Sequence, residues 1–251
     1  MQPPPEVTLQ GARLDYGGKT VFRDLDLVLA PGSWTGLLGE SGVGKSSLLR
    51  YLAGCAHNAA QVGRLTCSDG LPLGGRIAYM AQQDLLLPWL SVLQNVTLGR
   101  RLRDGSHRRP EVLAKARALL AAVGLSERAG DLPARLSGGM RQRAALARTL
   151  MEDRPVVLMD EPFSALDAIT RVRLQDLASE LLAGRSVLLV THDPMEALRL
   201  CDRVLVLAGQ PARLVSELTV EGRAPRATDN PAILAQQGAL LTRLAEGQVA
   251  A

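Results

Sequence analysis

A glycine-rich stretch, GESGVGKSS (Gly39–Ser47), constrains the fold of this 251-residue chain more than any other feature. It follows a short apolar run, WTGLLG (Trp34–Gly39), and precedes KSSLLRYLAG, which has the pattern of a helix. The pattern G-x-x-x-x-G-K-[ST] between a strand and a helix is typical of a loop whose backbone N–H groups surround a triphosphate. The sequence therefore predicts an α/β core that binds a nucleoside triphosphate.

Each residue type in this loop has its own expected role. Glycine lets the backbone approach the phosphates closely, Lys45 neutralises the β- and γ-phosphates, and the Ser46 hydroxyl is a ligand for Mg²⁺. A glycine-rich turn at a helix start is the simpler alternative, which the flanking strand and helix disfavour. The residues expected to contact nucleotide here are Gly39, Glu40, Ser41, Gly42, Val43, Gly44, Lys45, Ser46 and Ser47.

A second apolar run, PVVLMDE, ends in two adjacent carboxylates. Short, continuous apolar runs such as this one and SVLLVTH are typical of parallel strands that are buried on both faces. Asp160 is expected to hold Mg²⁺, usually through water, and Glu161 is expected to orient and polarise the attacking water. Paired acids at a strand end are often only solvated loop residues, but the phosphate loop upstream favours the catalytic interpretation.

The stretch RLSGGMRQRAALARTL (Arg135–Leu150) places Ser-Gly-Gly directly before an arginine-rich helix. Small residues at a helix start leave its first N–H groups uncovered, and such groups bind anions. This stretch is therefore expected to bind a phosphate.

The remaining patterns predict an α/β fold. Residues 7–16 and 21–30 alternate apolar and polar residues around a Gly-Gly turn, which predicts an antiparallel hairpin. RIAYMAQ (Arg76–Gln82) is another expected strand, and RVLVLAG (Arg203–Gly209) is expected to close the sheet. The expected fold class is α/β: a P-loop NTPase core, in which a mixed sheet is joined to an N-terminal antiparallel β subdomain, plus an inserted helical subdomain.

The middle of the chain is rich in predicted helix. Pro110 occupies a probable first helical position and Gly124 stops that helix, while Asn-Pro at 230–231 opens a weakly amphipathic helix. The whole chain is expected to form one domain. Its expected parts are a catalytic core (residues 1–82 and 153–215), a helical subdomain (83–152) and a C-terminal helical tail (216–251).

Composition disfavours several classes of protein. The net charge of +4 is mild and aromatic residues are only 3%, so the basic, aromatic-containing surface typical of nucleic-acid binding is not expected. Cys55, Cys67 and Cys201 lack metal-ligand spacing and are expected to be reduced structural thiols. No stretch approaches the ~20 apolar residues that cross a bilayer, and MQPPPEV lacks the features of a secretory signal. Any role at a membrane is therefore expected to come through a partner.

Together these motifs resemble the nucleotide-binding subunit of ABC (ATP-binding cassette) transporters, over nearly the whole chain. The resemblance implies that ATP and Mg²⁺ are the cofactors. Tyr16, in LDYGGKTVF, falls where the family's aromatic residue stacks on adenine, although packing on the core is the simpler alternative. Gln82 matches the glutamine of the Q-loop, which reaches Mg²⁺ and water. His192 matches the switch histidine, which contacts the γ-phosphate.

LSGG, from Leu136 to Gly139, is similar to the family signature, and SALD, from Ser164 to Asp167, is similar to its D-loop. In the family, the signature loop binds the ATP of a second copy, so the resemblance implies a head-to-tail homodimer with two shared ATP sites. Met140 stands where many members have Gln. Binding of ATP between the two copies is still expected, because the donors of the signature loop are backbone N–H groups. The expected catalytic residues are Glu161, His192 and Gln82. The expected metal-binding residues are Ser46, Gln82 and Asp160. Beyond the phosphate loop, the residues expected to bind ATP are Tyr16, Ser137, Gly138, Gly139 and Asp167.

QDLLLPWLSVLQNV (Gln83–Val96) lies where the family receives its transmembrane subunit, although subdomain core is the alternative interpretation. The pattern resembles importers for nitrate, sulfonates, taurine and the thiamine-precursor pyrimidine, the last most closely. The implied partners are two transmembrane permease subunits and an extracytoplasmic solute-binding protein, with no nucleic acid. The implied location is the cytoplasmic face of the inner membrane, as a peripheral subunit.

Two rival classes share part of these motifs. A GTPase needs an [NT]-K-x-D motif, and none of the three lysines is so placed. A soluble ABC ATPase acting on ribosomes or DNA is the better rival because it shares the ATP chemistry. Such proteins usually have a second cassette or a long coiled-coil insert, which this sequence lacks. The expected function is therefore ATP hydrolysis that energises a bacterial importer.

Overall fold

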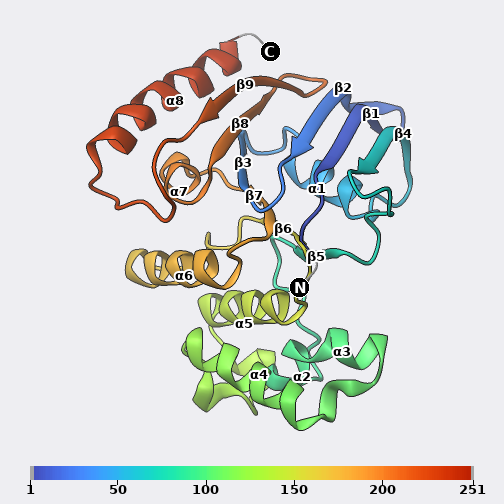
Figure 1. Cartoon of the computed structure of the whole chain (residues 1–251), viewed down its shortest axis with the longest axis vertical. Helices are drawn as coiled ribbons and strands as arrows, with labels where there is room; N and C mark the ends of the chain where they lie inside the picture. The colour runs from blue at the N-terminus through green and yellow to red at the C-terminus, as the bar shows by residue number, and fades with distance from the viewer. Residues whose placement is uncertain (1–2, 250–251) are drawn as a thin grey trace. The chain divides into compact units, whose positions relative to one another are not determined.

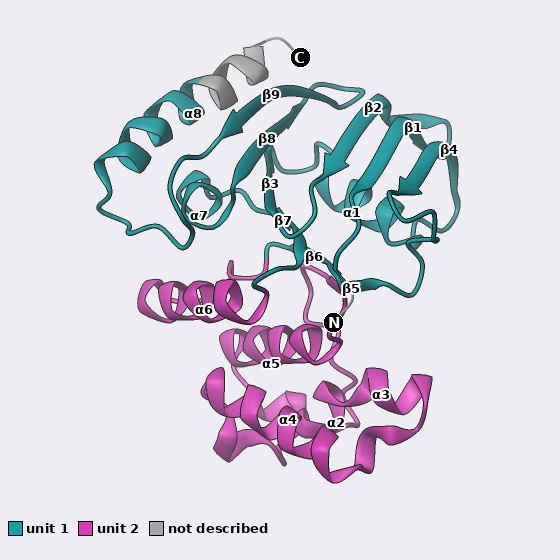
Figure 2. Ribbon diagram, viewed as in Figure 1, with its two compact units in different colours: residues 1–77, 155–161, 183–251 teal, residues 78–154, 162–182 magenta. Residues whose placement is uncertain are grey.

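The computed structural model describes residues 3–249 and divides the chain into two compact units (Figures 1 and 2). Unit 1 comprises residues 1–77, 155–161 and 183–251, and unit 2 comprises residues 78–154 and 162–182. The sequence-based division placed 162–182 in the catalytic core, whereas their contacts group them with unit 2. The difference arises because residues distant in sequence pack together, which a boundary drawn from composition does not reveal.

The smaller sheet of unit 1 contains three antiparallel strands in the order β2-β1-β4. β1 (Val7–Tyr16) and β2 (Lys19–Leu29) form the predicted hairpin. β4 (Ala59–Cys67) was not predicted. Most of its residues are exposed and a glycine lies at its centre, so it has no apolar alternation to indicate a strand.

The larger sheet supplies the core of unit 1, in the order β6-β7-β3-β8-β9. Every residue of β3, β6 and β7 is buried, and these strands pair in parallel, as their continuous apolar runs predicted. β8 also pairs in parallel with β3. The bounds are β3 (Trp34–Gly39), β6 (Val156–Asp160), β7 (Ser186–Val190), β8 (Arg203–Ala208) and β9 (Arg213–Thr219).

The prediction that β8 closes the sheet is wrong, because β9 pairs with it in antiparallel fashion on its outer side. The predicted helical tail from residue 216 therefore begins within a strand. β9 alternates exposed and half-buried residues and contains no continuous apolar run, so its sequence gave little indication of a strand. The chain then enters α8 (Pro231–Val249), which begins at the predicted proline. The other helices of unit 1 are α1 (Lys45–Leu52) and α7 (Pro194–Leu200).

Unit 2 is helical, and the chain enters it along β5 (Ile77–Met80). Its longest helices are α4 (Pro110–Ala122), α5 (Gly138–Met151) and α6 (Ala168–Leu181). Arg143 of α5 donates to the carbonyls of Val123 and Gly124, just after the end of α4. The shorter elements are α2 (Val92–Val96), α3 (Leu98–Arg103) and three 3-10 turns (Ser106–Arg108, Ser126–Arg128 and Pro133–Arg135). Within residues 3–249, the helices are too short or too polar to span a membrane.

Arg226 joins the end of α7 to the segment that leads into α8. Its guanidinium is 4% exposed and donates to five main-chain carbonyls. Two of these belong to Leu198 and Cys201, and the others to the turn at 220–222. One side chain therefore satisfies acceptors that are otherwise removed from water.

We expect Arg226→Met to destabilise the chain by about 3 kcal/mol or more, because several buried carbonyls lose their donor. Thermal unfolding should show a midpoint lowered by about 10 °C. Arg223→Met is the matched control, because Arg223 is exposed and three residues away. A variant of Arg226 that unfolds at the wild-type temperature would contradict this assignment.

Candidate functional site

The loop between β3 and α1 has a backbone that only glycine accommodates at its start. Gly39 has φ 156°, and a Cβ atom there would collide with the carbonyl oxygen of Leu207 on β8. Gly42 and Gly44 also have positive φ values, of 82° and 118°, and α1 begins directly after Gly44. The loop therefore ends at a helix N-terminus, where N–H groups favour a bound anion.

Lys45 lies across this loop. Its side chain is 6% exposed, and Nζ donates to the carbonyls of Gly39 and Glu40, each at 2.7 Å. Burial lowers the pKa of the ammonium, while the nearby charges of Glu161 and Asp160 act in the opposite direction. The chain thus holds a positive charge inside the loop, at the place where the motif requires one.

Asp160 ends β6 and is 2% exposed. Burial raises the pKa of its carboxyl group, and a hydrogen bond from the Ser46 side chain opposes that shift. The Ser46 hydroxyl of α1 and the Asp160 carboxyl group of β6 therefore lie in contact. Among the described residues, no group of three or more His, Cys, Asp or Glu side chains could hold a metal ion.

Glu161 and His192 form the third element of the site. Glu161 Oε2 lies 3.2 Å from His192 Nδ1, and the main-chain N–H of Glu161 donates to Val190 at the end of β7. The Glu161 side chain is 15% exposed and that of His192 is 59% exposed. Glu161 has φ 49°, a left-handed backbone that costs a residue with a side chain about 1 kcal/mol. The sequence did not indicate this strained conformation, which is typical of functional sites.

Unit 1 thus brings together five of the predicted residues, namely Lys45, Ser46, Asp160, Glu161 and His192. Tyr16, at the end of β1, is only half-buried, so it is not part of the apolar core.

Unit 2 contains the predicted residues of the Q-loop, the signature and the D-loop. Gln82 is exposed just after β5. Ser137 is the N-cap of α5, and its Oγ accepts from the N–H of Met140 at 3.3 Å, so the side chain covers one N–H expected to be bare. Gly138 and Gly139 form the first residues of that helix.

The D-loop packs closely against the start of α5. A Cβ at Gly139 would lie 3.2 Å from the carbonyl oxygen of Ala165. Asp167 caps α6 by accepting from the Thr170 N–H, and this bond lowers the pKa of its carboxyl group. A side chain at the second glycine of the signature would thus be a tight fit against the D-loop within unit 2.

Sequence reasoning missed three polar residues beside the signature, namely Asp84, Arg141 and Arg148. Arg141 Nε donates to Asp84 Oδ2 at 3.0 Å, and Arg148 donates to the carbonyls of Asp84 and Leu85. The one available indication was the spacing of the two arginines, which places them on the same face of one helix.

A glycine loop with a buried lysine, a Ser–Asp oxygen pair and a Glu–His pair at adjacent strand ends together define a P-loop nucleoside triphosphatase. A family model described as ABC transporter matches residues 22–164, more than half of the chain. The chain belongs to the ABC transporter family, and it is an ATP-binding ATPase of that family.

Relatives match over nearly the full length of both chains. An "Uncharacterized ABC transporter ATP-binding protein" of Haemophilus influenzae is 44% identical, with 95% of this chain and 98% of the relative covered. "Aliphatic sulfonates import ATP-binding protein SsuB 2" of Streptomyces avermitilis is also 44% identical, with 96% and 91% covered. A protein named "Aliphatic sulfonates import ATP-binding protein SsuB", from Delftia acidovorans, is 42% identical, with 95% and 93% covered.

A solved structure entitled "Dimeric Structure of MJ0796, a Bacterial ABC Transporter Cassette" superposes with a TM-score of 0.76 at 27% identity, covering 86% of this chain and all of that one. A post-hydrolysis structure of the same cassette, bound to ADP and Pi, gives 0.72 at 26% identity with the same coverage. The expected α/β cassette fold is thereby confirmed.

The strained backbone of Glu161 leads to a stability prediction. Asn tolerates the left-handed region better than Gln, and both substitutions remove the charge, so Glu161→Asn should be about 1 kcal/mol more stable than Glu161→Gln. Thermal unfolding should therefore show a midpoint about 2–4 °C higher for Asn. At Glu180, an exposed helical position, the same two substitutions should give the opposite order because Gln favours helix. Equal midpoints at position 161 would contradict the assigned strain.

Proposed function

We propose that this chain is the ATP-hydrolysing subunit of an importer for aliphatic sulfonates and works as a homodimer. The observation that supports hydrolysis most directly is the Glu161–His192 pair, 3.2 Å apart in the unit that also contains the buried Lys45. The importer role is supported by the full-length relatives named for sulfonate import.

Glu161 is the proposed general base. Its carboxylate orients the attacking water and accepts its proton, because a positioned carboxylate is the usual group for this step. His192 is half-exposed and is proposed to contact the γ-phosphate while it orients Glu161. Lys45 exchanges its two carbonyl partners for phosphate oxygens when ATP enters the loop. Tyr16 is proposed to stack on the adenine.

Ser46 and Asp160 are proposed to hold Mg²⁺, with Gln82 as a further ligand. The contact between a hydroxyl and a carboxylate fits this ion, which binds one or two protein oxygens and takes its other ligands from phosphates and water. The ion, when bound, neutralises charge on the phosphates.

Ser137, Gly138, Gly139 and Asp167 are proposed to complete the ATP site of a second copy. Ser137 and Gly138 are exposed on unit 2, where another molecule can approach them. The likeness to a dimeric cassette supports this arrangement. Because each copy supplies half of each site, ATP favours the closed dimer and hydrolysis releases it.

The segment after Gln82 is the proposed docking surface for a transmembrane permease subunit. Leu85 and Trp89 are 57% and 70% exposed, which is unusual for large apolar side chains that lie so close together in sequence. The simpler interpretation, that this run is core, holds for its buried members Leu86, Leu90, Val92 and Val96. The chain is accordingly proposed to sit at the cytoplasmic face of the membrane, with two permease subunits and an extracytoplasmic binding protein.

The class of solute is proposed from the names of the relatives. Two relatives above 40% identity are named for aliphatic sulfonates. The local likeness of MAQQDLLLPWLSV to pyrimidine-precursor importers covers only a short stretch, so the sulfonate class is the one proposed. Ligand screening of the cognate binding protein tests this assignment.

Glu161→Gln should bind ATP but hydrolyse it at least about 100-fold more slowly, because it loses the general base. With Mg²⁺ and ATP it should elute as a dimer in size-exclusion chromatography, and without nucleotide as a monomer. Lys45→Met is the matched control and should remain monomeric, because it lacks the phosphate-binding charge. Normal turnover by Glu161→Gln would remove this residue from the proposed role.

A further inference from the structure

Two arginines of α5 contact the segment that follows Gln82. Arg148 donates to the main-chain carbonyls of Asp84 at 2.6 Å and Leu85 at 2.7 Å. Arg141 donates from Nε to the Asp84 carboxylate at 3.0 Å. The two arginines are about two helical turns apart on one face of α5, and all these residues belong to unit 2.

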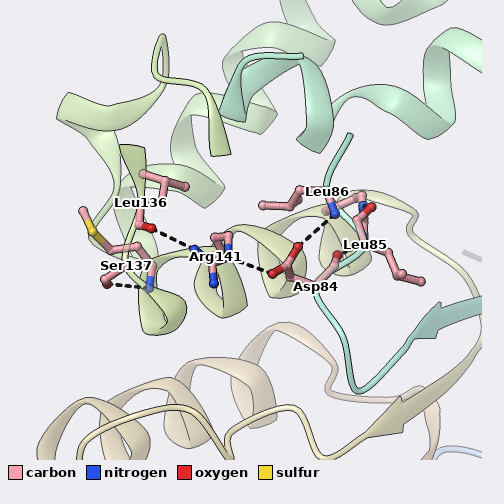
Figure 3. A network of polar contacts seen from close by, with 8 residues as sticks. Asp84, Leu85, Leu86, Leu136, Ser137 and Arg141 are labelled. Atoms are coloured by element: carbon pink, nitrogen blue, oxygen red, sulfur yellow. Dashed lines mark hydrogen bonds and ion pairs between the residues drawn. The ribbon is translucent and has the colours of Figure 1, made fainter. Parts of the chain in front are cut away.

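Arg141 makes a second bond that reaches the signature loop, defined here as Leu136–Gly139. Its Nη1 donates to the carbonyl of Leu136 at 2.9 Å, directly before Ser137 (Figure 3). The guanidinium is planar and rigid, so a fixed bond at one nitrogen orients the others. The Asp84 carboxylate therefore determines where Arg141 holds the peptide that enters the signature loop.

Asp84 is itself fixed by its own segment. Its Oδ1 accepts from the N–H of Leu86 at 3.0 Å, which closes a tight turn around Leu85. Leu85 has φ 46° and an exposed side chain. Farther along, the buried Asn95 accepts from the N–H of Leu87 and donates to the carbonyl of Leu90. The segment 84–90 lacks regular secondary structure, so these side chains define its shape.

We propose that Asp84 and Arg141 are positioning residues, whose ion pair holds the signature loop in the place where it engages the ATP of a second copy. This inference rests on the proposed function of that loop. Their side chains are 28% and 38% exposed, and half-exposed ion pairs stabilise a fold only slightly. A small displacement of a binding group, in contrast, lowers its effectiveness strongly. Loss of the pair should therefore affect dimerisation much more than stability.

The first test uses Asp84→Asn in the Glu161→Gln background. Asn has nearly the same shape and can still accept from Leu86 through Oδ1, while its NH2 group replaces the oxygen that accepts from Arg141, so both the charge and the hydrogen bond of the pair are removed. The ATP concentration for half-maximal dimerisation should rise about 10-fold. Binding of a fluorescent ATP analogue at protein concentrations that keep the chain monomeric should change less than about 2-fold, because Lys45 and its loop belong to unit 1. In the otherwise wild-type chain, KM for ATP should rise while kcat at saturating ATP stays close to its original value.

Lys115→Met is the matched control. It breaks the Lys115–Asp153 ion pair, 3.1 Å long and in the same unit, which joins α4 to the residues just after α5. Its dimerisation midpoint should equal that of the Glu161→Gln parent. Asp84→Glu, which keeps the charge, should recover part of the loss, a result that a purely structural defect would not produce.

A double-mutant cycle with Arg141→Met tests whether the two residues act together. The double variant should dimerise no more weakly than the weaker single variant. If a parent that binds ATP fails to dimerise, the proposed function fails and the inference fails with it. If the Glu161→Gln parent dimerises but both single variants have the same ATP midpoint as the parent, only the inference is overturned. The same holds if the effects of the two substitutions simply add. Should Asp84→Asn unfold at room temperature, Arg141→Lys must show the raised midpoint instead, and an unchanged value overturns the inference.

Discussion

The burial of one lysine ammonium is the interaction on which the nucleotide loop depends. A charge removed from water is costly unless it is paired and hydrogen-bonded, and Lys45 meets both conditions through two loop carbonyls and nearby carboxylates. These contacts require the loop to curve back over the start of α1, which Gly39 permits because it has no side chain to collide with β8. The lysine contacts and the glycine backbone therefore hold the loop in its curved shape.

The two units contain different kinds of functional group. Unit 1 contains titratable side chains at the ends of buried parallel strands, where Asp160 ends β6, Glu161 comes next and His192 lies just after β7. Unit 2 contains backbone and hydroxyl groups at helix starts, together with exposed apolar residues. This separation agrees with a division between phosphate chemistry in unit 1 and recognition of other molecules by unit 2.

Much of this architecture was predictable because it arises from local patterns. The continuous apolar runs of β3, β6 and β7 and the glycine loop are each contained within a few residues. β4 and β9 were missed because half-exposed edge strands lack such a run. The left-handed backbone of Glu161 and the Asp84–Arg141 pair, 57 residues apart, depend on tertiary context that no local pattern encodes. The catalytic, metal-binding and nucleotide-binding roles of all the site residues remain predictions.

The cap of α5 has a chemical consequence. A hydroxyl offers one proton and two lone pairs, and Ser137 engages one lone pair with the N–H of Met140. Its proton can therefore turn toward an incoming oxyanion while the first turn of the helix stays capped. Repeated arrival and departure of a phosphoryl group would then leave this helix end intact. A carboxylate would cap the helix equally well, but its charge would repel that group.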